Sequence, residues 1–293
     1  MKYAAIDIGS NAVRLLITQT HTHNGETRYK KVALVRVPLR LGHDAFTSGK
    51  ISTTKIKTLT QTMQAFAHLI AVHEVKHTMA CATSALREAS NGPALVQQLR
   101  RKTGLKIHII TGRREAEILY GTHIAEQLDK RRSYLYIDIG GGSTELTLFS
   151  KNKIVASNSF NLGTIRILED REPSETWTEI KLWLTRVAGQ AKGTLIGIGT
   201  GGNVNKIYRL SKTKKNNLLT YAKIRDLSEE LETYSFEERM AHFNLNPDRA
   251  DVIVPAAKIL LWAMKWSKIR RLHVPAVGLV DGMVGLMGER FSR

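Results

Sequence analysis

The feature that most constrains the fold is a short pattern that occurs twice in the chain. Residues 5–11 read Ala-Ile-Asp-Ile-Gly-Ser-Asn, and residues 136–142 read Tyr-Ile-Asp-Ile-Gly-Gly-Gly. Each copy places an aspartate at the end of an apolar strand, and the residues after the turn predict that the chain returns as a second strand. The sequence therefore predicts two β-hairpins about 130 residues apart, each opening a segment of domain size.

A glycine turn of this kind leaves backbone N–H groups that can hold a phosphate, beside an aspartate that can hold a cation. A third glycine turn at residues 196–203 could complete the same site. A dinucleotide loop is excluded because a strand, not a helix, follows the glycines, and the Walker sequence is absent. The predicted phosphate-binding residues are Gly9, Ser10, Asn11, Gly140, Gly141, Gly142, Ser143, Thr144 and Gly201.

Four motifs in the chain resemble those of the exopolyphosphatase and guanosine-pentaphosphate phosphohydrolase family, in its short two-domain form. They lie at residues 7–11, 82–89, 138–145 and 249–255, in the family order, and the resemblance covers nearly the whole chain. The family belongs to the sugar kinase, Hsp70 and actin superfamily. The resemblance therefore implies an α/β fold with two ribonuclease H-like domains around an interdomain cleft.

The duplicated hairpin and the resemblance together predict the domain boundaries. We expect a first actin-like domain at residues 1–125 and a second at 133–280, joined by the basic segment 121–133. A C-terminal helix at about 281–293 is expected to pack back on the first domain. Residues 40–46 are expected to form a loop.

The resemblance also implies catalytic residues. Aligned on the family segment, Glu115 takes the place of the residue that activates the attacking water, and Arg87 can contact a phosphate. Arg114 stands where the family has a first glutamate, and Val280-Asp281 departs from another family pair. If Glu115 is only a first-turn glutamate, it merely stabilises the helix dipole.

Carboxylates are the hard oxygen ligands that Mg²⁺ prefers. Asp138 and Glu145 are predicted to hold Mg²⁺, or Mn²⁺ in its place, with Asp7 as a further ligand. Residues 73–77 match the zinc-protease pattern H-E-x-x-H, which requires both histidines on one helix. Because a buried strand should follow at once, the helix is expected to end inside the motif, which excludes zinc.

The composition limits the partners. Forty-four Lys and Arg stand against 26 Asp and Glu, so the net charge of +18 favours a polyanionic ligand. Nucleic acid is disfavoured because the basic residues are scattered and no aromatic-studded strand accompanies them. Cys81 is the only cysteine, which excludes a disulfide framework. No apolar run of membrane-spanning length occurs, so we expect a cytoplasmic protein, and a homodimer is left open.

These observations predict an exopolyphosphatase that hydrolyses the terminal phosphoanhydride bond of polyphosphate and releases orthophosphate. Three alternatives stay open: a guanosine pentaphosphate 5′-phosphohydrolase, a kinase that transfers phosphate to a hydroxyl, and a polyphosphate or nucleotide sensor without turnover. Arg114 keeps the sensor hypothesis open. Polyphosphate is preferred because the high positive charge favours a ligand with many negative charges.

Overall fold

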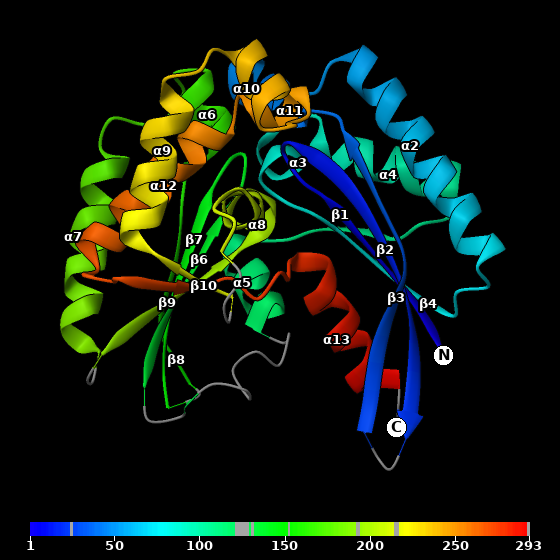
Figure 1. The fold of residues 1–293 in the computed structure, drawn as a ribbon. Helices are drawn as coiled ribbons and strands as arrows, with labels where there is room; N and C mark the ends of the chain where they lie inside the picture. The colour runs from blue at the N-terminus through cyan, green and yellow to red at the C-terminus, as the bar shows by residue number, and fades with distance from the viewer. Residues whose placement is uncertain are drawn as a thin grey trace. The chain divides into compact units, whose positions relative to one another are not determined.

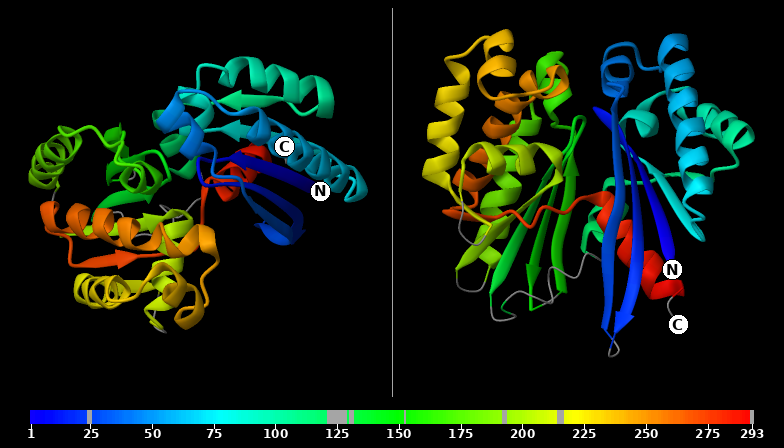
Figure 2. Two further views of the ribbon diagram at one scale, coloured as in Figure 1. Left: turned by 90° about the horizontal axis from the view of Figure 1, so that it is seen from above. Right: turned by 45° about the vertical axis from the view of Figure 1, so that its right-hand side comes forward.

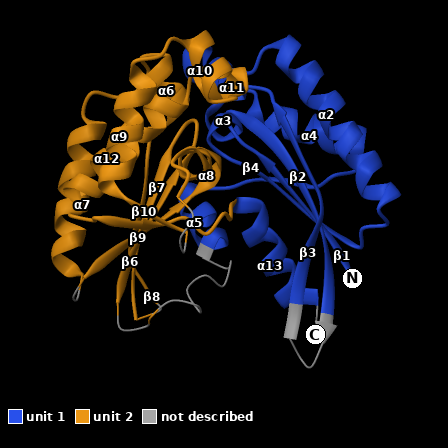
Figure 3. Ribbon diagram, in the orientation of Figure 1, with its two compact units in different colours: residues 1–122, 279–293 blue, residues 123–278 orange. Residues whose placement is uncertain are grey.

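The computed structural model describes residues 1–23, 26–120, 129, 132–151, 153–191, 194–213 and 217–291. Two compact units divide the chain: residues 1–122 with 279–293 form unit 1, and residues 123–278 form unit 2 (Figure 3). Each unit has its own sheet and its own apolar core. Most of the predicted junction at 121–133 lies outside the described residues.

The sheet of unit 1 has five strands in the order β3-β2-β1-β4-β5 (Figure 1). The first three are antiparallel neighbours, whereas β4 and β5 run parallel to β1. Residues 3–8 are all buried, as expected of a strand that is covered on both faces. The strands are β1 (Lys2–Ile8), β2 (Ala12–His23), β3 (Glu26–Pro38), β4 (His77–Ala82) and β5 (Ile107–Ile109).

Helices cover both faces of this sheet. Ile6 and Ile8 pack in a core with α2 and α4, whereas Tyr3, Ala5 and Cys81 pack in another core with α5 and α13. The last helix, α13, contacts β1, β2 and β4 as well as α5 (Figures 1 and 2). The helices are α1 (Leu41–Ser48), α2 (Thr53–Val72), α3 (Ser84–Glu88), α4 (Gly92–Thr103), α5 (Gly112–Tyr120) and α13 (Leu279–Phe291).

Two local predictions in unit 1 are tested directly. The prediction of a loop at residues 40–46 is wrong. Arg40 adopts a left-handed conformation (φ 51°), and helix α1 starts at the next residue. The break in the H-E-x-x-H motif is confirmed. Helix α2 ends at Val72, Glu74 turns the chain with φ 54°, and strand β4 begins at His77.

The sheet of unit 2 has six strands in the order β10-β11-β9-β6-β7-β8 (Figure 1). β6, β7 and β8 form an antiparallel meander, β9 and β11 run parallel to β6, and β10 is antiparallel to β11. The strands are β6 (Ser133–Ile139), β7 (Thr144–Ser150), β8 (Lys153–Phe160), β9 (Leu195–Thr200), β10 (Leu218–Thr220) and β11 (Arg271–His273).

The helices of unit 2 include α7, α8, α9 and α12, which share one core with Leu135, Ile137 and Leu146 of the sheet. Because side chains alternate along a strand, Asp138 and Glu145 project from the other face of β6 and β7. The helices are α6 (Thr164–Leu168), α7 (Thr176–Gln190), α8 (Gly201–Leu210), α9 (Tyr221–Glu232), α10 (Phe236–His242), α11 (Pro247–Ala250) and α12 (Ile253–Trp266).

The two sheets repeat one strand order. β6, β7, β8, β9 and β11 of unit 2 take the places of β1 to β5 of unit 1, and β10 is added at the edge. This is the ribonuclease H-like arrangement, so the predicted α/β fold of the actin-like superfamily is confirmed. Across the described part of the chain, no helix has the length and hydropathy needed to span a membrane.

Candidate active site

Three loops of unit 1 meet at one edge of its sheet. β1, β4 and β5 are parallel neighbours, so their carboxyl ends lie together. The Thr83 N–H donates to the Ile8 carbonyl at 3.2 Å, and the Ile110 N–H donates to the Ala82 carbonyl at 3.0 Å. Ligands of α/β sheets bind at this edge. The edge holds the first glycine turn, the start of α3 and the start of α5.

Contacts on two sides fix the first glycine turn. The Gly9 N–H donates to the Ala12 carbonyl at 3.2 Å, which closes the turn. The Ser10 and Ser84 hydroxyl oxygens lie 2.8 Å apart and are both buried. The Asn11 carbonyl accepts a hydrogen bond from the Arg40 N–H at 2.9 Å. The backbone of this predicted phosphate loop is thus held by α3 and by the segment before α1.

Asp7 lies opposite Arg14 on the hairpin. Arg14 Nη1 is 2.6 Å from Asp7 Oδ2, and Asp7 is only 4% exposed. Burial raises the pKa of the Asp7 carboxyl above its ordinary value, and Arg14 partly offsets this rise. The predicted role of Asp7 as a metal ligand stays a prediction, with one carboxylate oxygen already bound by the arginine.

The predicted catalytic residues Arg87 and Glu115 both lie at this edge. Arg87 is half-buried, and its Nη1 donates to the Ile110 carbonyl at 2.8 Å, which holds the guanidinium beside the segment that leads into α5. Glu115 is half-buried in the first turn of α5. The neighbouring Arg114 is exposed, and its Nη1 is 3.1 Å from Glu117 Oε2.

Cys81 is buried in the sheet of unit 1, directly beside Asp7 in the register of β1 and β4. Burial raises the pKa of the Cys81 thiol to about 12, and the nearby charges of Asp7 and Glu115 contribute to the rise. Asp7 and Cys81 lie on the face of the sheet that α5 and α13 cover, and Glu115 belongs to α5 itself. The thiol stays protonated at neutral pH, as expected of a small packing residue.

In the second glycine turn, which lies in unit 2, the backbone carbonyl groups accept hydrogen bonds from helix α6. The Gly140 N–H closes the turn on the Ser143 carbonyl at 2.9 Å. The carbonyls of Gly140, Gly141 and Gly142 accept hydrogen bonds from the Thr164 N–H, the Ile165 N–H and Arg166 Nε, at 3.1, 2.8 and 2.6 Å respectively. Helix α6 approaches so closely that a Cβ on Gly163 would overlap the Gly141 carbonyl.

The same turn also has backbone N–H groups at Gly141, Gly142 and Ser143. Within the residues that the structure describes, the N–H groups of Gly141, Gly142 and Ser143 donate to no other group. Successive N–H groups in such a turn form a concave site for an anion. Thr144 has a structural contact instead, because its hydroxyl donates to the Leu162 carbonyl at 2.5 Å.

Asp138 and Glu145 lie directly opposite each other on β6 and β7. Glu145 is buried, and its Oε1 accepts hydrogen bonds from the Ser143 hydroxyl at 2.6 Å and the Ser159 hydroxyl at 2.9 Å. Like charges directly opposite each other destabilise a sheet. A cation between or beside the two carboxylates would remove this repulsion.

This donor set fits Mg²⁺. The described ranges contain no group of three or more His, Cys, Asp and Glu that could hold a metal ion. Mg²⁺ does not require such a group, because it keeps several water ligands and is bound by one or two carboxylates together with substrate phosphates. Asp138 and Glu145 could therefore hold the ion next to the phosphate-binding N–H groups.

The third glycine turn approaches the same aspartate. Gly201 has φ 84°, and a Cβ at this position would overlap Asp138 Oδ1. Asn203 Nδ2 donates to the Ile139 carbonyl at 3.4 Å, and Arg249 Nη1 hydrogen-bonds Asn203 Oδ1. Neither Asn203 nor Arg249 is among the site residues predicted from the sequence. The signal that could have found Arg249 is its place at the start of the fourth family motif.

The predicted site residues thus form two sets, one in each unit. Both units have the strand order of an actin-like fold, and each carries a glycine turn that follows a strand with an aspartate near its end. The sequence matches the Ppx/GppA phosphatase family over residues 22–290, and the chain belongs to this family. The family prediction is confirmed, and the prediction of a phosphoanhydride hydrolase is confirmed at the level of the family.

Relatives whose names give different activities are similar to this chain. It is 24% identical over 310 residues to exopolyphosphatase 1 of Mycobacterium tuberculosis, covering 97% of this chain and 87% of the relative. It is 26% identical over 294 residues to the guanosine-5′-triphosphate,3′-diphosphate pyrophosphatase of Pseudoalteromonas translucida, covering 96% and 58%. The bifunctional 3-dehydroquinate synthase/phosphatase of Fusobacterium nucleatum is 31% identical over 170 residues, 57% of this chain and 26% of that protein.

Solved structures support the fold. An exopolyphosphatase from Cytophaga hutchinsonii superposes with a TM-score of 0.84 at 23% identity, covering 99% of this chain and 98% of that one. The Ppx/GppA family member of Aquifex aeolicus gives a TM-score of 0.77 at 24% identity, covering 100% and 99%. At these identities the similarity establishes the fold and not the substrate.

Proposed function

We propose that this protein hydrolyses the terminal phosphoanhydride bond of inorganic polyphosphate and releases orthophosphate. The observation that carries the proposal is the glycine turn of unit 2. Its carbonyls are bound by α6, its N–H groups at Gly141, Gly142 and Ser143 are available to phosphate oxygens, and the Asp138–Glu145 pair lies beside it. A phosphate chain needs both backbone donors and a cation.

Each residue set has a separate role in the proposal. The N–H groups of 141–143 bind phosphate oxygens, and Asp138 and Glu145 hold Mg²⁺, with Mn²⁺ as the alternative. When bound, the ion neutralises charge on the phosphates. Arg87 adds a fixed positive charge, because its contact with the Ile110 carbonyl leaves the rest of the planar guanidinium to bind an oxyanion.

Glu115 is the proposed general base. Its carboxylate takes a proton from a water molecule whose oxygen attacks the terminal phosphorus. The bond from that phosphorus to the bridging oxygen breaks, orthophosphate forms, and the shortened chain leaves with the bonding electron pair.

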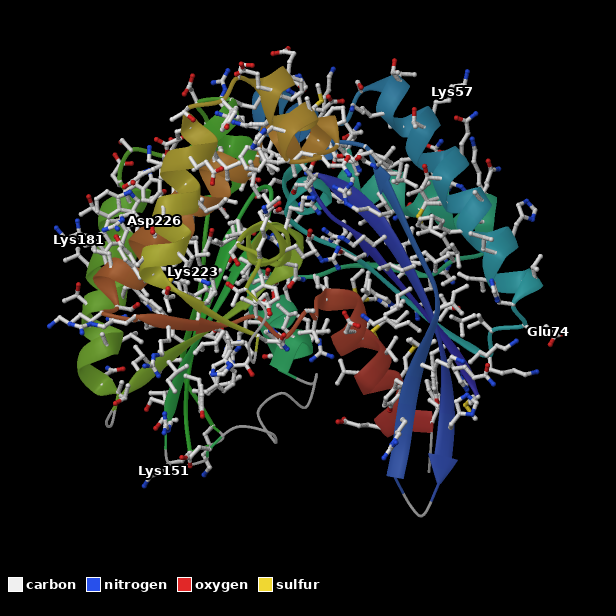
Figure 4. All side chains as sticks on the ribbon, viewed as in Figure 1. Lys57, Glu74, Lys151, Lys181, Lys223 and Asp226 are labelled. Atoms are coloured by element: carbon white, nitrogen blue, oxygen red, sulfur yellow. The ribbon has the colours of Figure 1, made fainter. Side chains whose placement is uncertain are left out.

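The positive charge favours polyphosphate over a guanine nucleotide. Exposed lysines contribute to the +18 charge, among them Lys57 on α2 and Lys181 on α7, whose side chains point outward (Figure 4). Such lysines act through the long-range field, which attracts a ligand in proportion to its charge. Guanosine pentaphosphate stays the second candidate, because a relative named for a guanosine nucleotide has an identity of 26%, close to the 24% of the exopolyphosphatase.

The test compares phosphate release from linear polyphosphate and from guanosine pentaphosphate at fixed salt with Mg²⁺, with product lengths resolved on a gel. We expect a higher specificity constant for polyphosphate and an affinity that falls with added salt. A higher constant for guanosine pentaphosphate would favour the second candidate. Binding of either ligand without phosphate release would favour a sensor.

A further inference from the structure

Thr200 carries a buried hydroxyl that has no evident role in the fold. It is the last residue of β9 and the N-cap of α8. A threonine N-cap usually accepts a hydrogen bond from the first turn of its helix, but the Thr200 side chain makes no such bond. The residue is 1% exposed, and its Oγ1 has no hydrogen-bond partner within the described residues.

The position of Thr200 explains what the hydroxyl could contact. In the parallel register of β6 and β9, Thr200 pairs with Asp138. Residues paired in register project to the same face of a sheet, so the two side chains are neighbours. The next residue, Gly201, lies against Asp138 Oδ1. The unpartnered hydroxyl is therefore next to one carboxylate of the Asp138–Glu145 pair.

A buried polar group without a partner destabilises a fold, unless a ligand or water supplies the partner. Here the adjacent groups are two carboxylates that fit a cation. Mg²⁺ retains water ligands, and outer groups that hydrogen-bond such ligands orient them. A hydroxyl suits this position because it can both donate and accept.

We propose that Thr200 is a positioning residue of the cation site. Its hydroxyl hydrogen-bonds a water molecule in the coordination shell of a divalent cation held by Asp138 and Glu145. The inference rests on the proposed function for the role of these two carboxylates. It adds a third member to the site, 62 residues after Asp138 and 55 residues after Glu145 in the chain.

The test is Mn²⁺ binding, measured by electron paramagnetic resonance on the full chain without substrate. Thr200→Val keeps the shape of the side chain and removes the hydroxyl, and Thr200→Ser keeps the hydroxyl. We expect Thr200→Val to weaken Mn²⁺ binding by about 10- to 100-fold, the usual effect of losing an outer-shell partner. Thr200→Ser should bind within about threefold of the wild type, since its hydroxyl is preserved.

Thermal unfolding without metal supplies the second readout. Since valine removes an unsatisfied hydroxyl, we expect Thr200→Val to unfold at the wild-type temperature or above it. Thr147→Val is the matched control. Thr147 is buried in the same sheet, and its hydroxyl is 2.9 Å from that of Ser157. This control should lower the unfolding temperature and leave Mn²⁺ affinity unchanged.

Three results would overturn the inference: wild-type Mn²⁺ affinity in Thr200→Val, equal losses in the serine and valine variants, or no Mn²⁺ binding by the wild type. If the valine variant does not fold, Thr200→Ala replaces it in the comparison with serine. Failure of the proposed function looks different. In that case polyphosphate is not hydrolysed, while Mn²⁺ still binds and Thr200→Val still weakens it.

Discussion

Hairpins β1–β2 and β6–β7 close with the same backbone hydrogen bond, but different side chains surround the aspartate of the first strand in each. In each, a glycine N–H donates to the carbonyl three residues later, at 3.2 Å for Gly9 and 2.9 Å for Gly140. The cross-strand partner of Asp7 is Arg14, whereas that of Asp138 is Glu145. Arg14 therefore offsets the charge of the first aspartate, whereas the cross-strand partner of the second is another acidic residue.

The residue that pairs with each aspartate from the parallel neighbouring strand also differs between the two units. Cys81 of β4 pairs with Asp7, and Thr200 of β9 pairs with Asp138. A thiol whose pKa is raised to about 12 is a poor ligand for Mg²⁺, whereas carboxylates and hydroxyls are hard oxygen donors. One fold used twice thus gives a general-base site in unit 1 and an oxygen-rich cation site in unit 2, as proposed above.

The largest expected effect comes from unit 1. Glu115→Gln should lower hydrolysis by roughly two to four orders of magnitude, because a general base contributes that much. Polyphosphate binding and thermal unfolding should be unchanged. Glu117→Gln is the control, since Glu117 is on the same helix and contacts Arg113 and Arg114. A Glu115→Gln enzyme with more than about a third of wild-type turnover would exclude Glu115 as the base.

The next prediction tests the difference in metal binding. Glu145→Gln should raise the Mg²⁺ concentration for half-maximal activity by at least the roughly 10- to 100-fold caused by losing an outer-shell group. Asp7→Asn should leave this concentration within a few-fold of wild type, because Arg14 already binds one Asp7 oxygen. Equal shifts in the two variants would show that both aspartate turns hold metal.

A smaller effect is expected where the third turn meets Asp138. Gly201→Ala introduces a Cβ that overlaps Asp138 Oδ1, in addition to the strain of a positive φ. Gly49→Ala is a matched control, because Gly49 has φ 71° and no atom within 4 Å of its added Cβ. Urea unfolding should show Gly201→Ala to be less stable than Gly49→Ala by about 1–3 kcal/mol, the usual cost of overpacking. Equal losses would mean that Asp138 moves aside freely.

The smallest effect concerns the pH dependence of stability. Burial raises the pKa of Asp7 above 3.8, so the folded state binds its proton more tightly than the unfolded state does. The stabilising contribution is complete below the unfolded pKa and is lost as pH rises through the folded pKa. Relative to Asp7→Asn, the wild-type free energy of unfolding should fall as pH increases from acid toward neutral. A difference that rises with pH would mean that Arg14 outweighs burial.

Alternating residues and glycines predicted both hairpins because those signals are local. The same reasoning correctly ended α2 inside the H-E-x-x-H motif, since a strand pattern follows it directly. It missed helix α1, because the start of that helix depends on the left-handed backbone of Arg40 and on contacts with the first turn. A segment of eight mixed polar and apolar residues with one glycine carries no clear helical period.

The sequence predicted only those parts of the candidate site whose residues lie close together along the chain. Asp138 and Glu145 face each other because they flank one turn of fixed length. Thr200, Asn203 and Arg249 reach that turn through the β6–β9 register and through α8 and α11, so their roles depend on tertiary packing. A sequence pattern shows such residues as separate motifs and does not show which carboxylate they approach.

The place of α13 has a consequence for synthesis of the chain. Unit 2 is one continuous segment, whereas unit 1 is completed by residues 279–293, which bring Met283, Val284 and Met287 against β1 and its neighbours. A ribosome adds about 5–20 residues per second, so the N-terminal sheet waits roughly 8–30 s for this helix while unit 2 is made. During translation, unit 2 is therefore able to complete its core before α13 covers its face of the N-terminal sheet.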